Sequence, residues 1–232
     1  MALLIPRRMR LPAVVVATSA WGVAVVVGVL VAGQRHADPL DRTLTDQVHA
    51  TVGNGEGLAA FLLLPTDTDV IACAVAVLVA VALCRRRWDV VLLAVATPSV
   101  CVAMTEFALK PLFGRRLYGL LSYPSGHAVA SIAVYTVAIL AFASAASRLR
   151  RWFAIAGWLV LAAVVVTGLV GMNCHYPTDA VGGVCVAVGV VLPCAIATDA
   201  LRRGGRHRPS IPRPRPSSDG YNPHPADYSL SD

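Results

Sequence analysis

The chain has 232 residues, of which 56% are hydrophobic and 14% charged, and its mean hydropathy is +0.66. Soluble globular proteins carry roughly 25% charged residues, so this composition excludes an ordinary soluble domain and indicates an integral membrane protein. The formal net charge of +7 would suit nucleic-acid binding, but the distribution of the basic residues along the chain argues against a nucleic-acid partner.

Six apolar stretches approach or reach the roughly 20 residues that a helix needs to cross a bilayer. In chain order they are residues 11–33, 69–84, 90–109, 127–146, 152–172 and 180–197. The first follows a basic start, but its apolar run is longer than the roughly 7–15 residues of a secretory signal core, which favours a retained span. The sequence therefore predicts an all-α fold, an integral membrane bundle of six transmembrane helices.

These stretches divide the chain into four parts. They are a basic N-terminal segment with the first span (1–33), an outer loop (34–68), a five-span core (69–200) and a tail (201–232). In the outer loop, Leu40, Leu44 and Val48 recur every four residues, which predicts a short amphipathic helix at the membrane surface. Residues 58–64 either extend the second span or lie at that surface.

The tail, from about Arg202 onward, is rich in Arg, Pro, Ser and Gly and has no periodicity. Such a segment buries too little apolar area to offset the entropy of ordering it. We expect a disordered cytoplasmic arm.

The basic residues predict the orientation in the membrane. With the N-terminus inside, 15 of the 20 fall on the cytoplasmic side: Arg7, Arg8, Arg10, Arg85, Arg86, Arg87, Arg148, Arg150, Arg151 and the six arginines from Arg202 onward. Such an asymmetry is what the positive-inside rule describes. We expect a multi-pass plasma-membrane protein with both termini in the cytoplasm.

The six cysteines lie in or beside apolar segments, without the paired spacing of a zinc site or a redox dithiol. We expect small apolar packing residues, no metal site and no cofactor. The oligomeric state is left open by the sequence.

Polar residues near membrane depth gather on the predicted outer face, where ionisable groups are costly unless paired or functional. Lys110, the only lysine, ends the third span, and Glu106 lies four residues earlier on the same helical face. Arg115 and Arg116 follow. Lys110 could instead be an interfacial anchor reaching the headgroups, but two histidines on the same face favour a functional site.

Two helix starts carry those histidines. Residues 124–127 read Pro-Ser-Gly-His, where Ser125 is a plausible N-cap and Gly126 leaves room for an oxyanion at the helix N-terminus. His175 precedes Asp179 by four residues, so the carboxylate can orient one ring nitrogen and leave the other free to attack. The alternatives are a capped helix that merely begins with His127, and a capping Asp179 beside an unrelated His175.

These residues resemble the motifs of the type 2 phosphatidic acid phosphatases, or lipid phosphate phosphatases, whose site is shared by class A acid phosphatases and vanadium haloperoxidases. The family pattern is Lys-(x)6-Arg-Pro, then Pro-Ser-Gly-His, then Ser-Arg-(x)5-His-(x)3-Asp. Lys110, residues 124–127, His175 and Asp179 match it. The resemblance covers roughly residues 58–200.

The chain departs from the family pattern in both arginine positions. Leu117 and Tyr118 stand where the first motif has Arg-Pro, and Gly168 and Leu169 stand where the third has Ser-Arg. Family members often carry a Gly-Arg pair where this chain has Gly114 and Arg115. We therefore expect Arg115 or Arg116 to replace the missing phosphate ligands.

The resemblance implies a metal-independent, two-step phosphatase. His175 attacks phosphorus and forms a phosphohistidine, Asp179 orients it, and His127 protonates the leaving group and then activates water. Lys110, Arg115 or Arg116, Ser125 and the Gly126 N–H would bind the phosphate oxygens.

The expected substrate is a membrane lipid phosphate monoester or a polyprenyl pyrophosphate, hydrolysed at the outer face, and its identity is open. The alternative is a catalytically weakened or inactive lipid-binding or scaffold member of the same fold. A transporter is disfavoured because the spans carry few ionisable groups, and a haloperoxidase because the chain is small and membrane-embedded.

Overall fold

The computed structural model describes residues 3–54, 57–143 and 147–204. The long helices are α1 (Arg10–Leu30), α4 (Thr68–Cys84), α5 (Trp88–Met104), α7 (Gly126–Ala143), α8 (Arg148–Gly171) and α9 (Pro177–Gly204). The shorter elements are α2 (Pro39–Val52), α3 (Leu58–Leu63), α6 (Lys110–Phe113), strands β1 (Arg116–Leu117) and β2 (Leu120–Leu121), 3-10 turns at Arg7–Met9 and Leu64–Thr66, and a π-helical turn at Thr105–Leu109. The protein is thus a helical bundle with one two-stranded hairpin in the described ranges.

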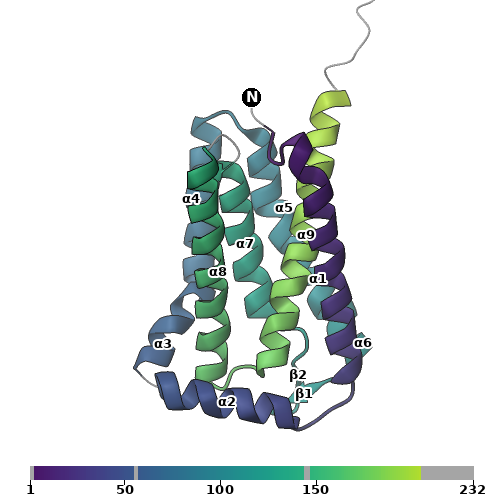
Figure 1. Cartoon of the computed structure of the whole chain (residues 1–232), viewed down its shortest axis with the longest axis vertical. Coiled ribbons are helices and arrows are strands. Elements are labelled where there is room, and N and C mark those ends of the chain that lie inside the picture. The colour runs from purple at the N-terminus through teal and green to yellow at the C-terminus, as the bar shows by residue number, and fades with distance from the viewer. Residues whose placement is uncertain (1–2, 55–56, 144–146, 205–232) are drawn as a thin grey trace, which may run out of the picture.

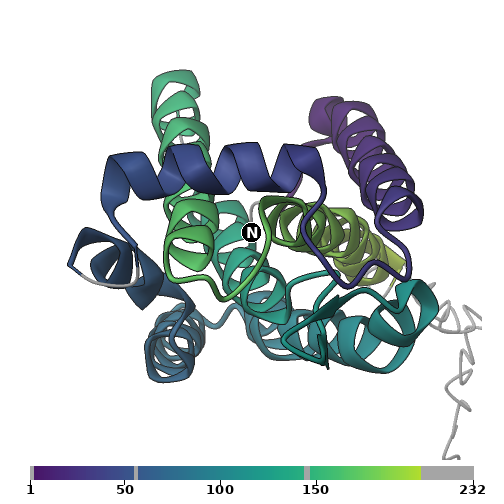
Figure 2. The ribbon, with the colours of Figure 1, turned by 90° about the horizontal axis from the view of Figure 1, so that it is seen from below.

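The long helices run side by side, and α2 lies across one end of the bundle (Figures 1 and 2). We call this end the α2 end; the hairpin and α3 lie there too. The other end holds the chain start and the end of α9. Helix α9 packs against α1, α5, α7 and α8, so it forms the centre of the bundle.

Four helical stretches are long and apolar enough to cross a membrane: Arg7–Leu30, Trp88–Phe113, Arg148–Gly171 and Pro177–Arg202. A fifth is obtained if Leu58–Thr66 and Thr68–Cys84, which meet at a 45° bend, form one span. The expected span 127–146 corresponds to α7, whose described apolar stretch, Gly126–Phe142, is shorter. The apolar helical bundle of a membrane protein is confirmed, whereas six spans are not.

The α2 end is built largely as the sequence predicts, except for the hairpin. Helix α2 covers the expected amphipathic segment and is capped by Asp38, whose carboxylate accepts a hydrogen bond from the Asp41 N–H at 2.7 Å. Residues 58–63 form their own helix, α3, which bends away from α4 instead of continuing it straight. The hairpin at 116–121 is not predicted by the sequence pattern.

The opposite end is held together by buried carboxylates. Asp199, on α9, is fully buried and accepts hydrogen bonds from the backbone N–H groups of Leu4 and Ile5 at 3.1 and 3.0 Å. Arg202 donates to Asp89, at the start of α5, at 2.6 Å. Helix α9 therefore continues to Gly204, and the prediction that disorder begins near residue 201 is wrong for residues 201–204. The rest of the tail lies outside the described residues.

The close approach of α3 to α8 gives a physical reason for Gly168. A Cβ at this position would lie 2.6 Å from the backbone carbonyl carbon and oxygen of Leu62, a separation that a backbone atom cannot relieve cheaply. The serine of the family motif therefore cannot fit here without moving α3.

We expect Gly168→Ala to lower the stability of the protein by about 1–3 kcal/mol, since overpacking forces the backbone to shift. Gly157→Ala is the matched control, because it lies in the same helix and a Cβ there would have nothing within 4 Å. Thermal unfolding in detergent measures both. A Gly168→Ala protein as stable as the control would contradict the close α3–α8 packing.

Candidate functional site

Three helix ends lie at the α2 end of the bundle (Figure 1). Helix α7 starts at Gly126 and α9 at Pro177, so both present their N-termini at this end of the bundle. Helix α5 continues through the π-helical turn Thr105–Leu109 into α6. Turns of this kind occur frequently at functional sites, and this one carries Glu106 towards Lys110.

A cavity of about 490 Å³ lies between these ends. Its lining includes Glu106, Lys110, Gly126, His127 and His175, which we call its polar part. It also includes aliphatic side chains from α4, α5, α7 and the hairpin, which we call its apolar part: Ile71, Val102, Ala130, Leu117, Leu120 and Leu121. The structure thus brings the two expected histidines, the lysine and the glycine into one space.

The two histidine rings lie edge to face at the cavity, with their planes inclined at 60°. Their centroids are 6.0 Å apart. His175 Nδ1 lies 3.7 Å from Asp179 Oδ2, which is close enough for a charge interaction but longer than a hydrogen bond. Nδ1 is buried without a hydrogen-bond partner among the described residues. Asp179 lies on the Nδ1 side, so Nε2 is the ring nitrogen left for attack.

Lys110 forms an ion pair with Glu106, which lies one helical turn earlier in the chain. Lys110 Nζ lies 2.7 Å from Glu106 Oε1 and 2.9 Å from Oε2. The pairing expected from the four-residue spacing is therefore confirmed. Gly126 borders this pair, because a Cβ on Gly126 would be 2.6 Å from Glu106 Oε1.

Ser125 forms hydrogen bonds with backbone groups and does not line the cavity. Its hydroxyl accepts a hydrogen bond from the Ala128 N–H at 3.3 Å, so it caps α7 as expected. Its side chain is fully buried, and its N–H donates to the Asp179 carbonyl at 3.0 Å. This backbone bond fixes the start of α7 to the first turn of α9, and with it the relative position of the two histidines.

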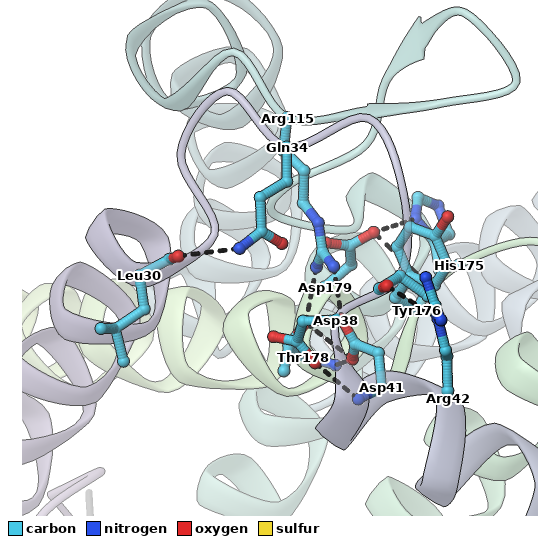
Figure 3. A network of polar contacts seen from close by, with 11 residues as sticks. Leu30, Gln34, Asp38, Asp41, Arg42, Arg115, His175, Tyr176, Thr178 and Asp179 are labelled. Carbon is cyan, nitrogen blue, oxygen red and sulfur yellow. Dashed lines mark hydrogen bonds and ion pairs between the residues drawn. The ribbon is translucent and has the colours of Figure 1, made fainter.

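Arg115 is the centre of a buried ion-pair network (Figure 3). Its side chain is fully buried, Nη1 donates to Asp179 Oδ1 at 2.7 Å, and Nη2 pairs with Asp41. Its guanidinium also stacks on Tyr176, 4.4 Å from the ring centroid. Burial lowers the pKa of Arg115, but Asp179 and Asp41 outweigh it and hold this pKa above its ordinary value.

Asp41 and Thr178 are site-supporting residues that the sequence does not reveal. The Asp41 carboxylate is fully buried and accepts from the Thr178 N–H at 3.0 Å and from its hydroxyl at 2.9 Å. It therefore caps the N-terminus of α9 from α2. The only signal in the sequence is an acidic residue in the first turn of an amphipathic helix, which is usually solvent-exposed.

The expected arginine ligands are not in the cavity. Arg115 is enclosed by its carboxylates, and the exposed Arg116 donates to the Gly119 carbonyl at 2.8 Å within the hairpin. Neither lines the cavity. Their expected role is therefore not supported by their placement, because one guanidinium is already neutralised and the other points along the hairpin.

The two leucines in the motif's arginine positions have different surroundings. Leu117 lines the cavity, so its side chain is where a phosphate ligand could act. Leu169 is fully buried in the hydrophobic core. The first departure thus removes a cation from the cavity wall, whereas the second replaces it by core packing.

Among the described residues, no group of three or more His, Cys, Asp or Glu side chains is placed to hold a metal ion. The polar part of the cavity can position an anion against two imidazoles, one lysine and a helix N-terminus. That set suits nucleophilic and acid–base chemistry on a phosphate.

Comparison with known proteins gives a family match in the part of the chain that contains both histidines. Residues 112–203 match the family model of the PAP2 superfamily. Neither a curated protein nor a solved structure matches the chain. The matched segment contains α7, α9 up to residue 203, both histidines and Asp179. Residues 112–203 of this chain are therefore similar to the PAP2 superfamily, and this similarity suggests a phosphatase-type activity.

Proposed function

We propose that this protein is a membrane phosphatase that removes phosphate from a lipid phosphate monoester or a polyprenyl pyrophosphate through a phosphohistidine on His175. The observation that carries the proposal is the mixed lining of the cavity, in which His127, His175 and Lys110 are joined by several aliphatic side chains. A phosphate attached to an apolar chain fits both parts, whereas a fully polar substrate leaves the apolar part unfilled.

The reaction proceeds in two balanced steps. His175 Nε2 attacks phosphorus, the bond to the leaving oxygen breaks, and protonated His127 gives its proton to that oxygen. Water then attacks the phosphohistidine, His127 takes the proton from this water, and the P–N bond breaks to release phosphate. Asp179 stabilises the charge that develops on the His175 ring, while Lys110 and the Gly126 N–H offset the charge on the phosphate oxygens.

The proposed orientation places the α2 end outside. The chain start, the α4–α5 connection and the end of α9 share the other end (Figure 1), which gathers Arg7, Arg8, Arg10 and Arg85–Arg87 there. The positive-inside rule makes that end cytoplasmic. The cavity then opens at the extracytoplasmic headgroup level, where the phosphate of a membrane lipid lies.

The test is phosphate release from detergent-purified protein, across phosphatidic acid, phosphatidylglycerol phosphate, polyprenyl pyrophosphate and a polyprenyl-linked sugar phosphate. We expect turnover of at least one substrate, and its persistence in EDTA. Activity that EDTA abolishes and a divalent cation restores would contradict the metal-independent mechanism.

A second candidate, a lipid-binding member with little or no catalysis, is favoured by Leu117, which leaves the cavity wall without the arginine of the motif. The two candidates make opposite predictions for turnover. Robust hydrolysis of any of the four substrates excludes the non-catalytic one.

Leu117→Arg adds the missing donor to the cavity wall. We expect turnover to rise about tenfold or more, because a single donor to a developing oxyanion is worth roughly 100- to 1,000-fold in rate at an optimised site. Leu40→Arg is the control, since Leu40 is an exposed leucine of α2 that does not line the cavity, so that the variant adds the same charge to the same end of the bundle. Equal effects of the two variants would show that general charge, and not position 117, limits the reaction.

A further inference from the structure

Glu106 lies where a substrate phosphate would bind. Its carboxylate touches Lys110 Nζ at 2.7 Å and lies against Gly126, at the first turn of α7. These are the partners that an anion in this cavity would use, a lysine and a helix N-terminus. A carboxylate and a phosphate oxygen cannot both occupy this space.

The charges that line the cavity make the competition between the Glu106 carboxylate and a phosphate strong. Among the described residues that line the cavity, Lys110 is the only arginine or lysine and Glu106 is the only carboxylate. The neighbouring cation Arg115 is already paired with Asp41 and Asp179. The Lys110–Glu106 pair therefore contributes no net positive charge to attract a free phosphate.

The Glu106 side chain has room to leave. It is 40% exposed, whereas Lys110 is 14% exposed, and its backbone lies in the π-helical turn Thr105–Leu109. An incoming phosphate can therefore displace the carboxylate out of the cavity while Lys110 stays in place.

We infer that Glu106 is a specificity-determining residue: an internal competitor that occupies the anion position and excludes phosphates that lack an apolar chain. The inference rests on the proposed function. Displacing Glu106 costs binding free energy, which inorganic phosphate cannot recover from Lys110 alone. A lipid phosphate recovers it by burying methylene groups against the apolar part of the cavity. Glu106 also weakens product inhibition, because it competes with the inorganic phosphate that the reaction releases.

The variant Glu106→Gln tests this, because it keeps the size and hydrogen bonding of the side chain and removes its charge. We expect inorganic phosphate and orthovanadate to bind about tenfold more tightly, since a like charge within about 4 Å is removed. The KM for p-nitrophenyl phosphate, a substrate without a lipid chain, should fall similarly, with a smaller change in kcat. Glu106→Asp, which retains the charge, should resemble the wild type.

The control is Asp69→Asn, which removes one negative charge from an exposed position in the first turn of α4, outside the cavity lining. Phosphate binding is measured by titration calorimetry, which needs no turnover. Phosphate binding that is equal in Glu106→Gln and the wild type, or tightened as much by Asp69→Asn, overturns the inference. A tenfold gain confined to Glu106→Gln supports it, and would do so even if no lipid phosphate were hydrolysed, a result that would count against the proposed reaction alone.

Discussion

We expect His175→Ala to abolish phosphate release, with a loss of at least about 10⁴-fold in kcat. The variant removes the only nucleophile of the proposed mechanism, and triad knockouts in hydrolases cost losses of this order or more. Release of phosphate from the preferred lipid substrate in detergent measures it. His36→Ala is the matched control, because it removes an exposed histidine in the segment between α1 and α2.

A His175→Ala protein that retains more than a small fraction of wild-type activity would eliminate the phosphohistidine pathway. His127→Ala gives a distinct outcome, because loss of the acid–base residue slows both steps but leaves the nucleophile in place. A phosphoenzyme formed from a substrate with a good leaving group should therefore persist longer in this variant than in the wild type.

Arg115→Met destabilises the protein by about 3–5 kcal/mol and removes its activity, since breaking a buried ion pair leaves an uncompensated charge. Here two fully buried carboxylates, Asp41 and Asp179, lose their shared partner. Asp179 is then no longer held beside His175, and α2 is no longer tied to the start of α9. Arg116→Met, the exposed neighbour, should change neither property. Thermal unfolding and phosphate release measure the two effects.

Arg115→Lys separates this role from direct phosphate binding. A lysine keeps the charge but cannot donate to both carboxylates in the fork geometry of a guanidinium, so we expect a partial loss of stability and a lower kcat. A variant that stays fully stable and shows only a raised KM would instead make Arg115 a substrate ligand.

The helices and the histidine pair could be predicted because their signals are local. Hydropathy marks each apolar stretch, the Pro-Ser-Gly-His motif marks the start of α7, and the four-residue spacing places Asp179 beside His175. The pairing of Lys110 with Glu106 follows from the same helical periodicity. Each of these predictions needs only neighbours along one helix.

The surroundings of Arg115 could not be predicted, because its partners come from distant segments. Asp41 is 74 residues away and Asp179 is 64 residues away along the chain, and their burial depends on how α2 folds over the bundle. The family pattern favoured a phosphate ligand near this position. In the structure the arginine instead holds Asp179, the carboxylate that lies beside His175.

The length of α7 and the bend before α4 also could not be predicted from the sequence pattern. Apolar composition continues past the point where α7's described apolar stretch ends, and it also spans α3, the turn at Leu64–Thr66 and α4. Hydropathy reports which residues avoid water but not where a helix turns. The six apolar stretches of the sequence therefore correspond to four or five candidate spans in the described residues.

The most direct test of the central claim is to trap the covalent intermediate. Protein in detergent is mixed with a ³²P-labelled lipid phosphate, quenched in alkali within the first turnover, and digested to locate the label. We predict an alkali-stable, acid-labile phosphate on the peptide that contains His175, retained in His127→Ala and absent from His175→Ala. Phosphate release without any such label, or a label that persists in His175→Ala, would contradict the account.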